Sequence, residues 1–290
     1  MRIYEAIRRT AINRLDSEVL LAHVLKKDRS WLIAHCDEEL AEHQIKEFDE
    51  LVERRKNHEP VAYITGEKEF YGRKFKVDKR VLIPRPATET LVDEVIGVLE
   101  CWNIGMLEYS KITDADTDIV IFTNIFDVQQ SEFSNQSSAI NTQPPRESIT
   151  IVDVGTGSGC IGITLALEIP NIKIICTDIS EGALEVAKEN ARLHGVFDRI
   201  SFQKSDLISN KLITNNYKLK TFIVVSNPPY ISLNKQLPPD VADFEPKSAL
   251  YAGTDGMDIV KKLYEQCKND NNCLGCVLEI PHQLAKKITQ

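Results

Sequence analysis

The chain has 290 residues, a net charge of −8 and an isoelectric point near 5.4. Its hydrophobic fraction of 42% is that of a globular protein with one or two domains, while the acidic balance disfavours binding of bare nucleic acid through a basic face. Since the chain lacks an apolar run of about 18 residues, no membrane span is expected. The early acid Glu5, the missing apolar signal core and the scattered cysteines predict a cytoplasmic protein with reduced thiols.

The stretch before Pro60 has the pattern of amphipathic helices. Ile45, Phe48 and Val52 recur every three or four residues, which places them on one helix face. We therefore predict a small helical domain over residues 1–60. Its expected core consists of Val19, Leu20, Leu21, Val24, Leu40, Phe48 and Val52.

The next stretch alternates apolar and polar side chains around Gly72, a pattern typical of a β-hairpin, and we expect a hairpin linker over residues 61–86. A helix should follow over residues 88–99, with Thr88 as its N-cap, because threonine side chains accept hydrogen bonds from the first turn of a helix. Beyond the linker, residues 87–290 alternate between strand and helix patterns. This alternation predicts an α/β domain with a mostly parallel sheet.

One segment of this domain, residues 101–148, is rich in Asn, Ser, Gln, Thr and Asp and mostly lacks helix or strand periodicity. We expect a mobile polar insert on the surface. Its apolar stretch Ile119–Phe122 is an exception, since it could form a strand or pack locally. The strands expected outside the insert are residues 150–154, 172–177, 200–203, 222–226 and 276–280, with a last helix over 281–288.

The first of these strands runs into a glycine-rich turn, where glycine lets the backbone turn tightly and approach a ligand closely. The turn consists of Gly155, Thr156, Gly157, Ser158 and Gly159. The next strand ends in Asp178, and an acid at that place can accept hydrogen bonds from ribose hydroxyls. Asp206 and Leu207 follow the third strand, so that a nucleoside can lie along these strand ends.

The fourth strand ends in Asn227-Pro228-Pro229-Tyr230. Two successive prolines cannot continue a strand, because each lacks an N–H donor, so the tetrapeptide should lie at the carboxyl edge of the sheet. It offers an amide, backbone carbonyls and an aromatic ring, which suit a planar NH2 group. A nicotinamide cofactor, which the spacing Gly157-x-Gly159-x-x-Gly162 would allow, leaves this tetrapeptide unexplained.

The glycine turn, Asp178 and the Asn-Pro-Pro-Tyr tetrapeptide together resemble a class I methyltransferase of the amino-methylating kind. Further segments resemble the HemK/PrmC family of protein N5-glutamine methyltransferases. These segments are Phe70–Phe75, Val81–Glu89, Phe244–Leu250 and Gly253–Met257. The resemblance implies a Rossmann-like methyltransferase domain, a helical domain that docks the substrate, and S-adenosyl-L-methionine as cofactor. It also implies that the target is the glutamine of a Gly-Gly-Gln motif in class I peptide chain release factors, which would support translation termination.

The resemblance also implies roles for single residues. The glycine turn would hold the methionine and ribose end of the cofactor and Asp178 its ribose hydroxyls, while Asp206 and Leu207 would border the adenine. In the substrate site, Asn227 and the Pro228 carbonyl would accept the two N–H bonds of the glutamine, while Pro229 and Tyr230 would complete the site. Arg85 and Glu89 would line the substrate channel, although Ala87 replaces the acid that the family usually has there.

Two other functions stay open. An adenine-N6 methyltransferase also uses Asn-Pro-Pro-Tyr, but the helical domain has only the short basic run Arg54–Lys56 for nucleic acid. A non-catalytic, truncated cofactor-binding module is the other. The class has seven strands and we expect five, so strand 276–280 would be an exposed edge, and we expect the chain to be part of a longer product.

Pro281 stands where the family tends to have glycine, and the isolated Cys273-x-x-Cys276 pair is interpreted as packing, without a metal.

Overall fold

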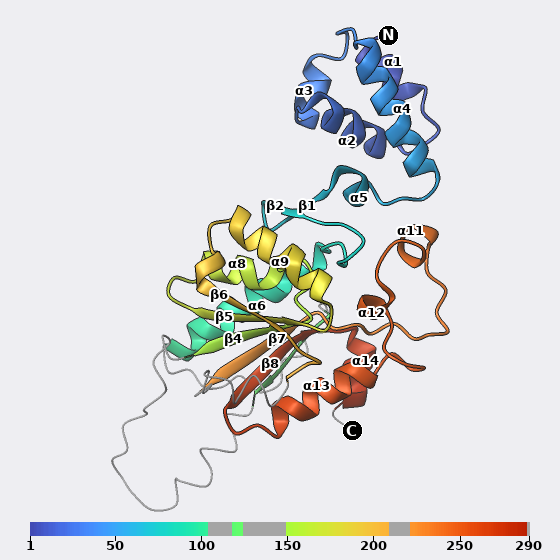
Figure 1. Ribbon diagram of the computed structural model, residues 1–290. Coiled ribbons are helices and arrows are strands. Elements are labelled where there is room, and N and C mark those ends of the chain that lie inside the picture. Colours follow the sequence, from blue (N-terminus) through green and yellow to red (C-terminus); the bar gives the residue numbers. More distant parts are fainter. Residues whose placement is uncertain (104–117, 124–148, 209–220, 289–290) are drawn as a thin grey trace, which may run out of the picture.

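The computed structural model describes residues 1–103, 118–123, 149–208 and 221–288. A small helical domain is followed by a β-hairpin and then by an α/β domain (Figure 1). This arrangement confirms the fold class predicted from the sequence. Among the described residues, no helix combines the length and the apolar character needed to cross a membrane.

The helical domain buries the apolar faces of short helices against one another. The helices are α1 (Ile3–Arg8), α2 (Arg14–Leu25), α3 (Arg29–Ala34), α4 (Glu42–Lys56) and α5 (Val61–Thr65). The Asn13 side chain caps α2 by accepting a hydrogen bond from the backbone N–H of Leu15. The Asp28 side chain caps α3 by accepting one from the backbone N–H of Trp31. The predicted core is confirmed except for Val19, which is half-buried. The buried members are Leu20, Leu21, Val24, Leu40, Phe48 and Val52.

The hairpin consists of β1 (Glu67–Phe70) and β2 (Arg73–Lys76). Its turn residues Tyr71 and Gly72 have φ values of +53° and +68°, which is the backbone of a type I′ turn. Asn190 of the α/β domain fixes this hairpin: its Oδ1 accepts from the Lys76 N–H at 2.7 Å, and its Nδ2 donates to the Lys76 carbonyl at 3.0 Å. The linker is therefore anchored on the domain that follows it.

The α/β domain is built on a six-stranded sheet with the order β3-β8-β7-β4-β5-β6. The strands are β3 (Ile119–Thr123), β4 (Thr150–Val154), β5 (Lys173–Asp178), β6 (Ile200–Lys204), β7 (Phe222–Ser226) and β8 (Cys273–Glu279). All neighbours pair in parallel except β3 and β8, which are antiparallel. Strands β4 and β7 are buried along their whole length, as expected for the centre of a sheet covered on both faces.

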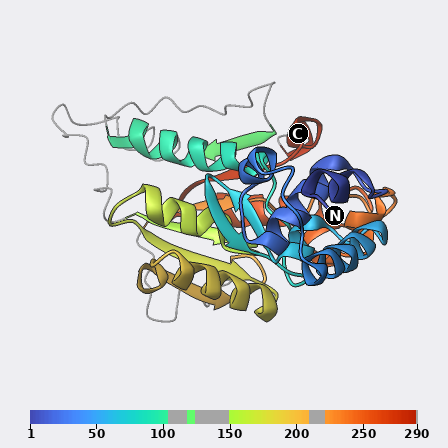
Figure 2. The same ribbon diagram turned by 90° about the horizontal axis from the view of Figure 1, so that it is seen from above.

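Helices cover both faces of this sheet. On one face lie α6 (Ala87–Asn103), α8 (Cys160–Glu168) and α9 (Glu181–Leu193), which run side by side (Figure 2). On the other face lie α13 (Asp258–Lys268) and α14 (His282–Ile288). The remaining elements are the 3-10 turn η2 (Phe197–Arg199) and the short helices α11 (Pro239–Ala242) and α12 (Lys247–Leu250).

The prediction that strand 276–280 forms an exposed edge is wrong. Strand β3, from the predicted insert, pairs with β8 in the register Ile121↔Val277, and the N–H of Ile280 donates to the Asp118 carbonyl at 2.7 Å. The physical reason is that Ile119–Phe122 is buried and covers the apolar edge of β8. Helix α6 extends to Asn103, and the rest of the predicted insert lies outside the described residues.

Candidate active site

Four neighbouring strands, β7, β4, β5 and β6, end at one edge of the sheet. Parallel pairing sets Asp153 beside Val225 and Val154 beside Thr177, and it sets Asp178 beside Lys204. The segments that follow these strands therefore meet at the carboxyl edge, where open α/β sheets bind their ligands. They are the glycine turn, Asp178, Asp206-Leu207 and the Asn227–Tyr230 tetrapeptide, as the sequence predicted.

The glycine turn presents bare backbone. Gly155, Gly157 and Gly159 have φ values of +70°, +54° and +83°, in the region that side chains rarely adopt. A Cβ atom added at Gly155 would meet no atom within 4 Å, so this part of the turn is open to a ligand. By contrast, a Cβ at Gly162 would lie 3.0 Å from Oδ2 of Asp153, because helix α8 packs closely on the sheet. An open glycine turn before a buried helix suits the nucleoside cofactor that the sequence predicted.

Asp178 is tied to the glycine turn. Its Oδ2 accepts a hydrogen bond from the Gly157 N–H at 3.0 Å, and its Oδ1 accepts one from the Ser180 N–H at 2.9 Å. Burial raises the pKa of this carboxyl above its usual range, while the two backbone hydrogen bonds act against the shift. Each carboxylate oxygen has further lone pairs, so the side chain keeps acceptor capacity for ribose hydroxyls.

Asp153 is a buried residue beside the glycine turn that the sequence reasoning did not single out. It is fully buried in β4, where its Oδ2 accepts from Thr156 Oγ1 at 2.5 Å and from the Gly162 N–H at 3.0 Å. Its Oδ1 has no hydrogen-bond partner among the described residues. Burial raises the pKa of this carboxyl from 3.8 to about 6. The sequence did carry a signal, since an acid within the apolar run of β4 is rarely buried unless it is hydrogen-bonded, as Asp153 is to Thr156 and Gly162.

The turn after β6 has a polar and an apolar side. Asp206 is exposed and forms an ion pair with Lys262 of α13, with 2.6 Å between Oδ2 and Nζ. Leu207 has a φ of +57° and packs against the apolar cluster below the sheet. The Ser205 hydroxyl donates to the Leu207 carbonyl at 2.7 Å and fixes this backbone. Leu207 is therefore placed to form an apolar wall, and the predicted cofactor roles of both residues remain predictions.

The tetrapeptide after β7 is held on both sides. The Ser226 hydroxyl donates to the Val154 carbonyl at 2.6 Å, which ties the end of β7 to the end of β4. Asn227 is half-buried, and its Nδ2 donates to Oγ1 of Thr88 at 3.0 Å. The prediction that Thr88 is an N-cap is therefore wrong: helix α6 begins at Ala87, and the hydroxyl is used by Asn227 instead.

The rest of the tetrapeptide is held by backbone hydrogen bonds with a later segment of the chain. Pro228 is buried, Pro229 and Tyr230 are half-buried, and burial raises the pKa of the Tyr230 hydroxyl. The backbone of Ile231 pairs with a later segment, donating to the Leu250 carbonyl at 3.0 Å and accepting from the Ala252 N–H at 2.9 Å. The position of the Tyr230 ring thus depends on residues that follow some twenty positions later in the chain.

Arg85 and Glu89 both make contacts within the protein. Arg85 Nη2 lies 2.5 Å from Oε1 of Glu245, whose side chain is almost fully buried. Glu89 accepts a hydrogen bond from the backbone N–H of Tyr71 in the hairpin turn at 2.8 Å. These contacts fix the segment between hairpin and α6 near the tetrapeptide, and the substrate-binding role of both residues remains a prediction.

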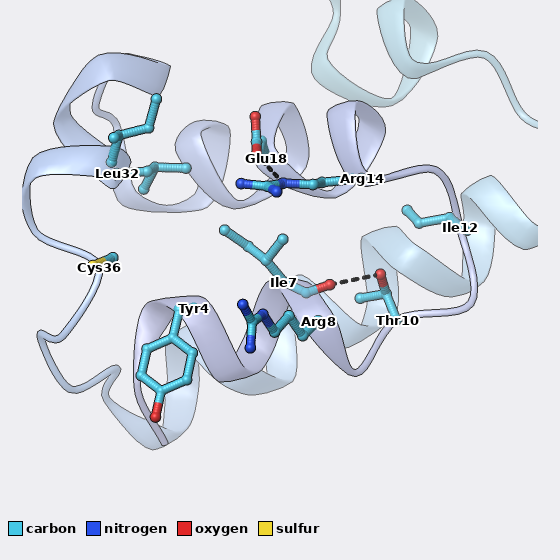
Figure 3. A pocket seen from close by; sticks show the side chains of 10 residues that line it. Tyr4, Ile7, Arg8, Thr10, Ile12, Arg14, Glu18, Leu32 and Cys36 are labelled. Atoms are coloured by element: carbon cyan, nitrogen blue, oxygen red, sulfur yellow. Dashed lines mark hydrogen bonds and ion pairs between the residues drawn. The ribbon is translucent and has the colours of Figure 1, made fainter.

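A hollow lies in the helical domain. It has a volume of about 410 Å³ and is bordered by α1, α2 and α3 (Figure 3). Its lining combines aliphatic side chains, such as Ile7 and Leu32, with the polar side chains of Arg8 and Arg14. Glu18 holds Arg14 with 2.8 Å between Oε1 and Nε. Substrate docking on this domain remains a prediction.

Two family models match this chain and indicate the class of protein to which it belongs. Residues 5–66 match the family described as the PrmC N-terminal domain, and residues 136–243 match the methyltransferase small domain. The fold and these matches define a methyltransferase with a Rossmann-like α/β domain.

Relatives of similar sequence identify the family of this chain. A release factor glutamine methyltransferase of Bacillus cereus is 35% identical over 278 residues, which cover 93% of this chain and 82% of that protein. A bifunctional methyltransferase of Rickettsia typhi is 38% identical over 281 residues, which cover 95% of this chain and 48% of that protein. The chain belongs to the release factor glutamine methyltransferase family, and it spans about half the length of the Rickettsia relatives that it matches.

Proposed function

We propose that this chain transfers a methyl group from S-adenosyl-L-methionine to the side-chain nitrogen of the glutamine in the Gly-Gly-Gln motif of class I peptide chain release factors. The observation that carries the proposal is the half-buried amide of Asn227, held by Thr88 at the sheet edge that also bears the glycine turn. The family of the chain supports a protein glutamine as the acceptor. The acceptor site and the cofactor site would then adjoin at one sheet edge.

The cofactor, when bound, supplies an electrophilic methyl group on a positively charged sulfonium. The glycine turn from Gly155 to Gly159 offers it open backbone, and Asp178 offers carboxylate lone pairs to the ribose. Asp206 and Leu207 lie at the end of the next strand and would border the adenine. The donor set of this edge therefore fits such a cofactor.

The protein residues act on the glutamine mainly by orienting it. An amide nitrogen is a weak nucleophile, because its lone pair is delocalised into the carbonyl. Asn227 Oδ1 and the Pro228 carbonyl accept one N–H bond each, which holds the nitrogen and favours its pyramidal form. Tyr230 packs on the planar amide and excludes water. Catalysis then rests on position and on electrostatics matched to the transition state. No strong base is needed before transfer, because the nitrogen becomes acidic once it is methylated and then releases one proton.

The test is transfer of a labelled methyl group to a purified class I release factor, with its Gly-Gly-Gln glutamine intact in one sample and changed to asparagine in the other. We expect label in the intact factor only. Asn227→Ala should lower kcat at least about 100-fold, as is typical for losing one transition-state contact. Asn272→Ala is the matched control, because Asn272 is exposed at the opposite end of the sheet and should leave kcat unchanged.

Three outcomes would contradict the proposal. Label in DNA or RNA instead of the release factor would identify an adenine-N6 methyltransferase. Equal labelling of both release factors would exclude the Gly-Gly-Gln glutamine as the target. Normal cofactor binding in calorimetry, with no label in either release factor, would identify a binding module without turnover.

A further inference from the structure

The side chain of Asn190 joins two segments that lie far apart in the sequence. Its Nδ2 donates to the carbonyl of Ser158 in the glycine turn at 2.8 Å and to the carbonyl of Lys76 in the hairpin at 3.0 Å. Its Oδ1 accepts from the Lys76 N–H at 2.7 Å. Asn190 belongs to α9 and is 0% exposed, so bulk water does not compete for these contacts. One buried amide therefore connects the proposed cofactor turn to the hairpin linker.

These three hydrogen bonds require a group that donates twice and accepts once. The amide of Asn190 uses both of its N–H donors and one lone pair of its oxygen. A carboxylate of the same shape would set an oxygen against two backbone carbonyl oxygens, because it has no proton to donate. An aliphatic side chain would take a hydrogen-bond partner from three backbone groups at once. The chemistry of this position is therefore specific to a carboxamide.

The glycine turn packs closely on the helix that carries Asn190. A Cβ atom added at Gly159 would lie 3.1 Å from the Cβ of Ala187, which stands three positions before Asn190 in α9. Ser158 is 2% exposed, whereas a Cβ atom added at Gly155 would meet no atom within 4 Å. The Ser158 side of the turn is thus covered by α9, and the Gly155 side is open to a ligand. Asn190 holds the turn from the side opposite to its open face.

The hairpin packs on the same helix. Helix α9 contacts strand β2 (Figure 1). His194 Nε2 lies 2.9 Å from the carbonyl oxygen of Lys74, and the rings of His194 and Phe75 lie 4.8 Å apart between their centroids. Lys76 pairs with Glu67, the first residue of β1, so Asn190 binds the hairpin at its base, where the helical domain joins it. Helix α9 therefore supports both the hairpin and the glycine turn.

We propose that Asn190 is a positioning residue that couples the glycine turn to the hairpin, so that cofactor binding and the order of the hairpin support each other. This inference rests on the proposed function, since it takes the glycine turn as the site of S-adenosyl-L-methionine. A cofactor that orders the turn also fixes the Ser158 carbonyl, and Asn190 then holds Lys76 more firmly. Because such coupling is reciprocal, a protein substrate that orders the hairpin raises the affinity for the cofactor by the same factor.

The test compares Asn190→Ala, which removes all three hydrogen bonds, with Asn190→Asp, which keeps the shape and an acceptor for the Lys76 N–H. We expect both variants to raise the Kd for S-adenosyl-L-methionine roughly tenfold in calorimetry, because the Ser158 carbonyl loses its donor. The KM for the cofactor should rise by a similar factor, while kcat stays within about threefold of the wild type. Glu189→Ala is the matched control. Its carboxylate lies 3.5 Å from Lys76 Nζ on the surface and is 43% exposed, so the variant should bind the cofactor like the wild type.

A second readout, residue-resolved amide hydrogen exchange, does not depend on turnover. It follows the Lys76 N–H, which donates to Asn190, and the Gly159 N–H, which donates to the Thr156 carbonyl within the turn at 2.8 Å. Both should exchange faster in Asn190→Ala. In Asn190→Asp the Gly159 N–H should exchange faster, while the Lys76 N–H keeps more of its protection. In the wild type, added S-adenosyl-L-methionine should slow exchange at Lys76, and Asn190→Ala should abolish this response.

The possible outcomes separate the role of Asn190 from the proposed function. Native cofactor affinity and native Gly159 exchange in both Asn190 variants would overturn the coupling, because Asn190 would then hold the hairpin alone. Exchange at Lys76 that does not respond to the cofactor in the wild type would also overturn it, and this measurement needs no variant to fold. A wild-type chain that binds the cofactor but labels no release factor would overturn the proposed function and leave the coupling intact. A wild-type chain that does not bind the cofactor would overturn both.

Discussion

Gly256 packs against the backbone carbonyl of Tyr230, and a Cβ atom added at Gly256 would clash with that carbonyl oxygen. Its φ of +76° also favours glycine. The strand-like contacts of Ile231 with Leu250 and Ala252 hold the two segments at this distance. The backbone that carries the aromatic ring of the proposed acceptor site is therefore set by a glycine far along the chain.

Gly256→Ala should displace Tyr230 and lower both stability and methyl transfer. Gly195→Ala is the matched control, because Gly195 has a φ of +69° but an added Cβ would meet no atom within 4 Å. The control should lose about 1–2 kcal/mol through backbone strain alone. Gly256→Ala should lose at least about 1 kcal/mol more, as overpacking does, with a fall in kcat of about tenfold or more. Urea denaturation and labelled methyl transfer measure the two effects, and equal behaviour of both variants would show that the contact with Tyr230 is unimportant.

Strand β3 should protect the edge of β8. Ile121 is 2% exposed and pairs with Val277, so Ile121→Lys places a charge in the core and detaches the strand. We expect a loss of several kcal/mol and self-association through the uncovered β8 edge. The control is Ile33→Lys, since Ile33 of α3 is 67% exposed. Thermal denaturation and light scattering provide the measurement, and a native melting temperature for Ile121→Lys would mean that β3 contributes little.

The Arg85–Glu245 ion pair should matter for stability. The Glu245 side chain is 1% exposed, so Arg85→Met leaves a buried carboxylate without its partner and should cost about 3 kcal/mol. The double variant Arg85→Met/Glu245→Gln should recover much of this loss, because no buried charge remains. A double-mutant cycle by urea denaturation gives the coupling energy. Additive losses would indicate that the two side chains do not depend on each other.

The regular part of the sheet could be predicted because its signals are local. Strands β4, β5, β6 and β7 agree with the predicted ranges to within one residue, since each carries apolar side chains and has a glycine, proline or aspartate within two residues of its carboxyl end. Strand β8 begins three residues earlier than predicted, at Cys273, because Gly275 weakens the strand pattern. The antiparallel place of β3 could not be predicted, because it depends on pairing with a strand more than 150 positions later.

The residues of the candidate site also fall into those that the sequence could predict and those that it could not. Residues that follow parallel strands, such as Asp178 and Asn227, were predicted because topology alone brings strand ends together. The contact of Asn227 with Thr88 joins residues 139 positions apart, and no local pattern indicates it.

The buried carboxyl of Asp153 should make stability depend on pH. Burial raises its pKa from 3.8 to about 6, so between these values the folded chain keeps a proton that the unfolded chain has lost. The free energy of unfolding therefore falls as pH rises through this window, because the folded state binds more protons. Below this pH window, the titration of Asp153 does not change the free energy of unfolding. Above the window, the decrease in the free energy of unfolding is constant at about 3 kcal/mol.

Asp153→Asn should remove this dependence. An amide oxygen can still accept from Thr156 and from the Gly162 N–H, as Oδ2 does, and the side chain no longer ionises. The variant should thus gain stability relative to the wild type between about pH 4 and pH 6, and this gain should persist to neutral pH. Urea denaturation of both proteins in steps of pH measures the difference. If the two stability curves stay parallel across the window, Asp153 titrates equally in the folded and unfolded chains, and its burial does not govern its protonation.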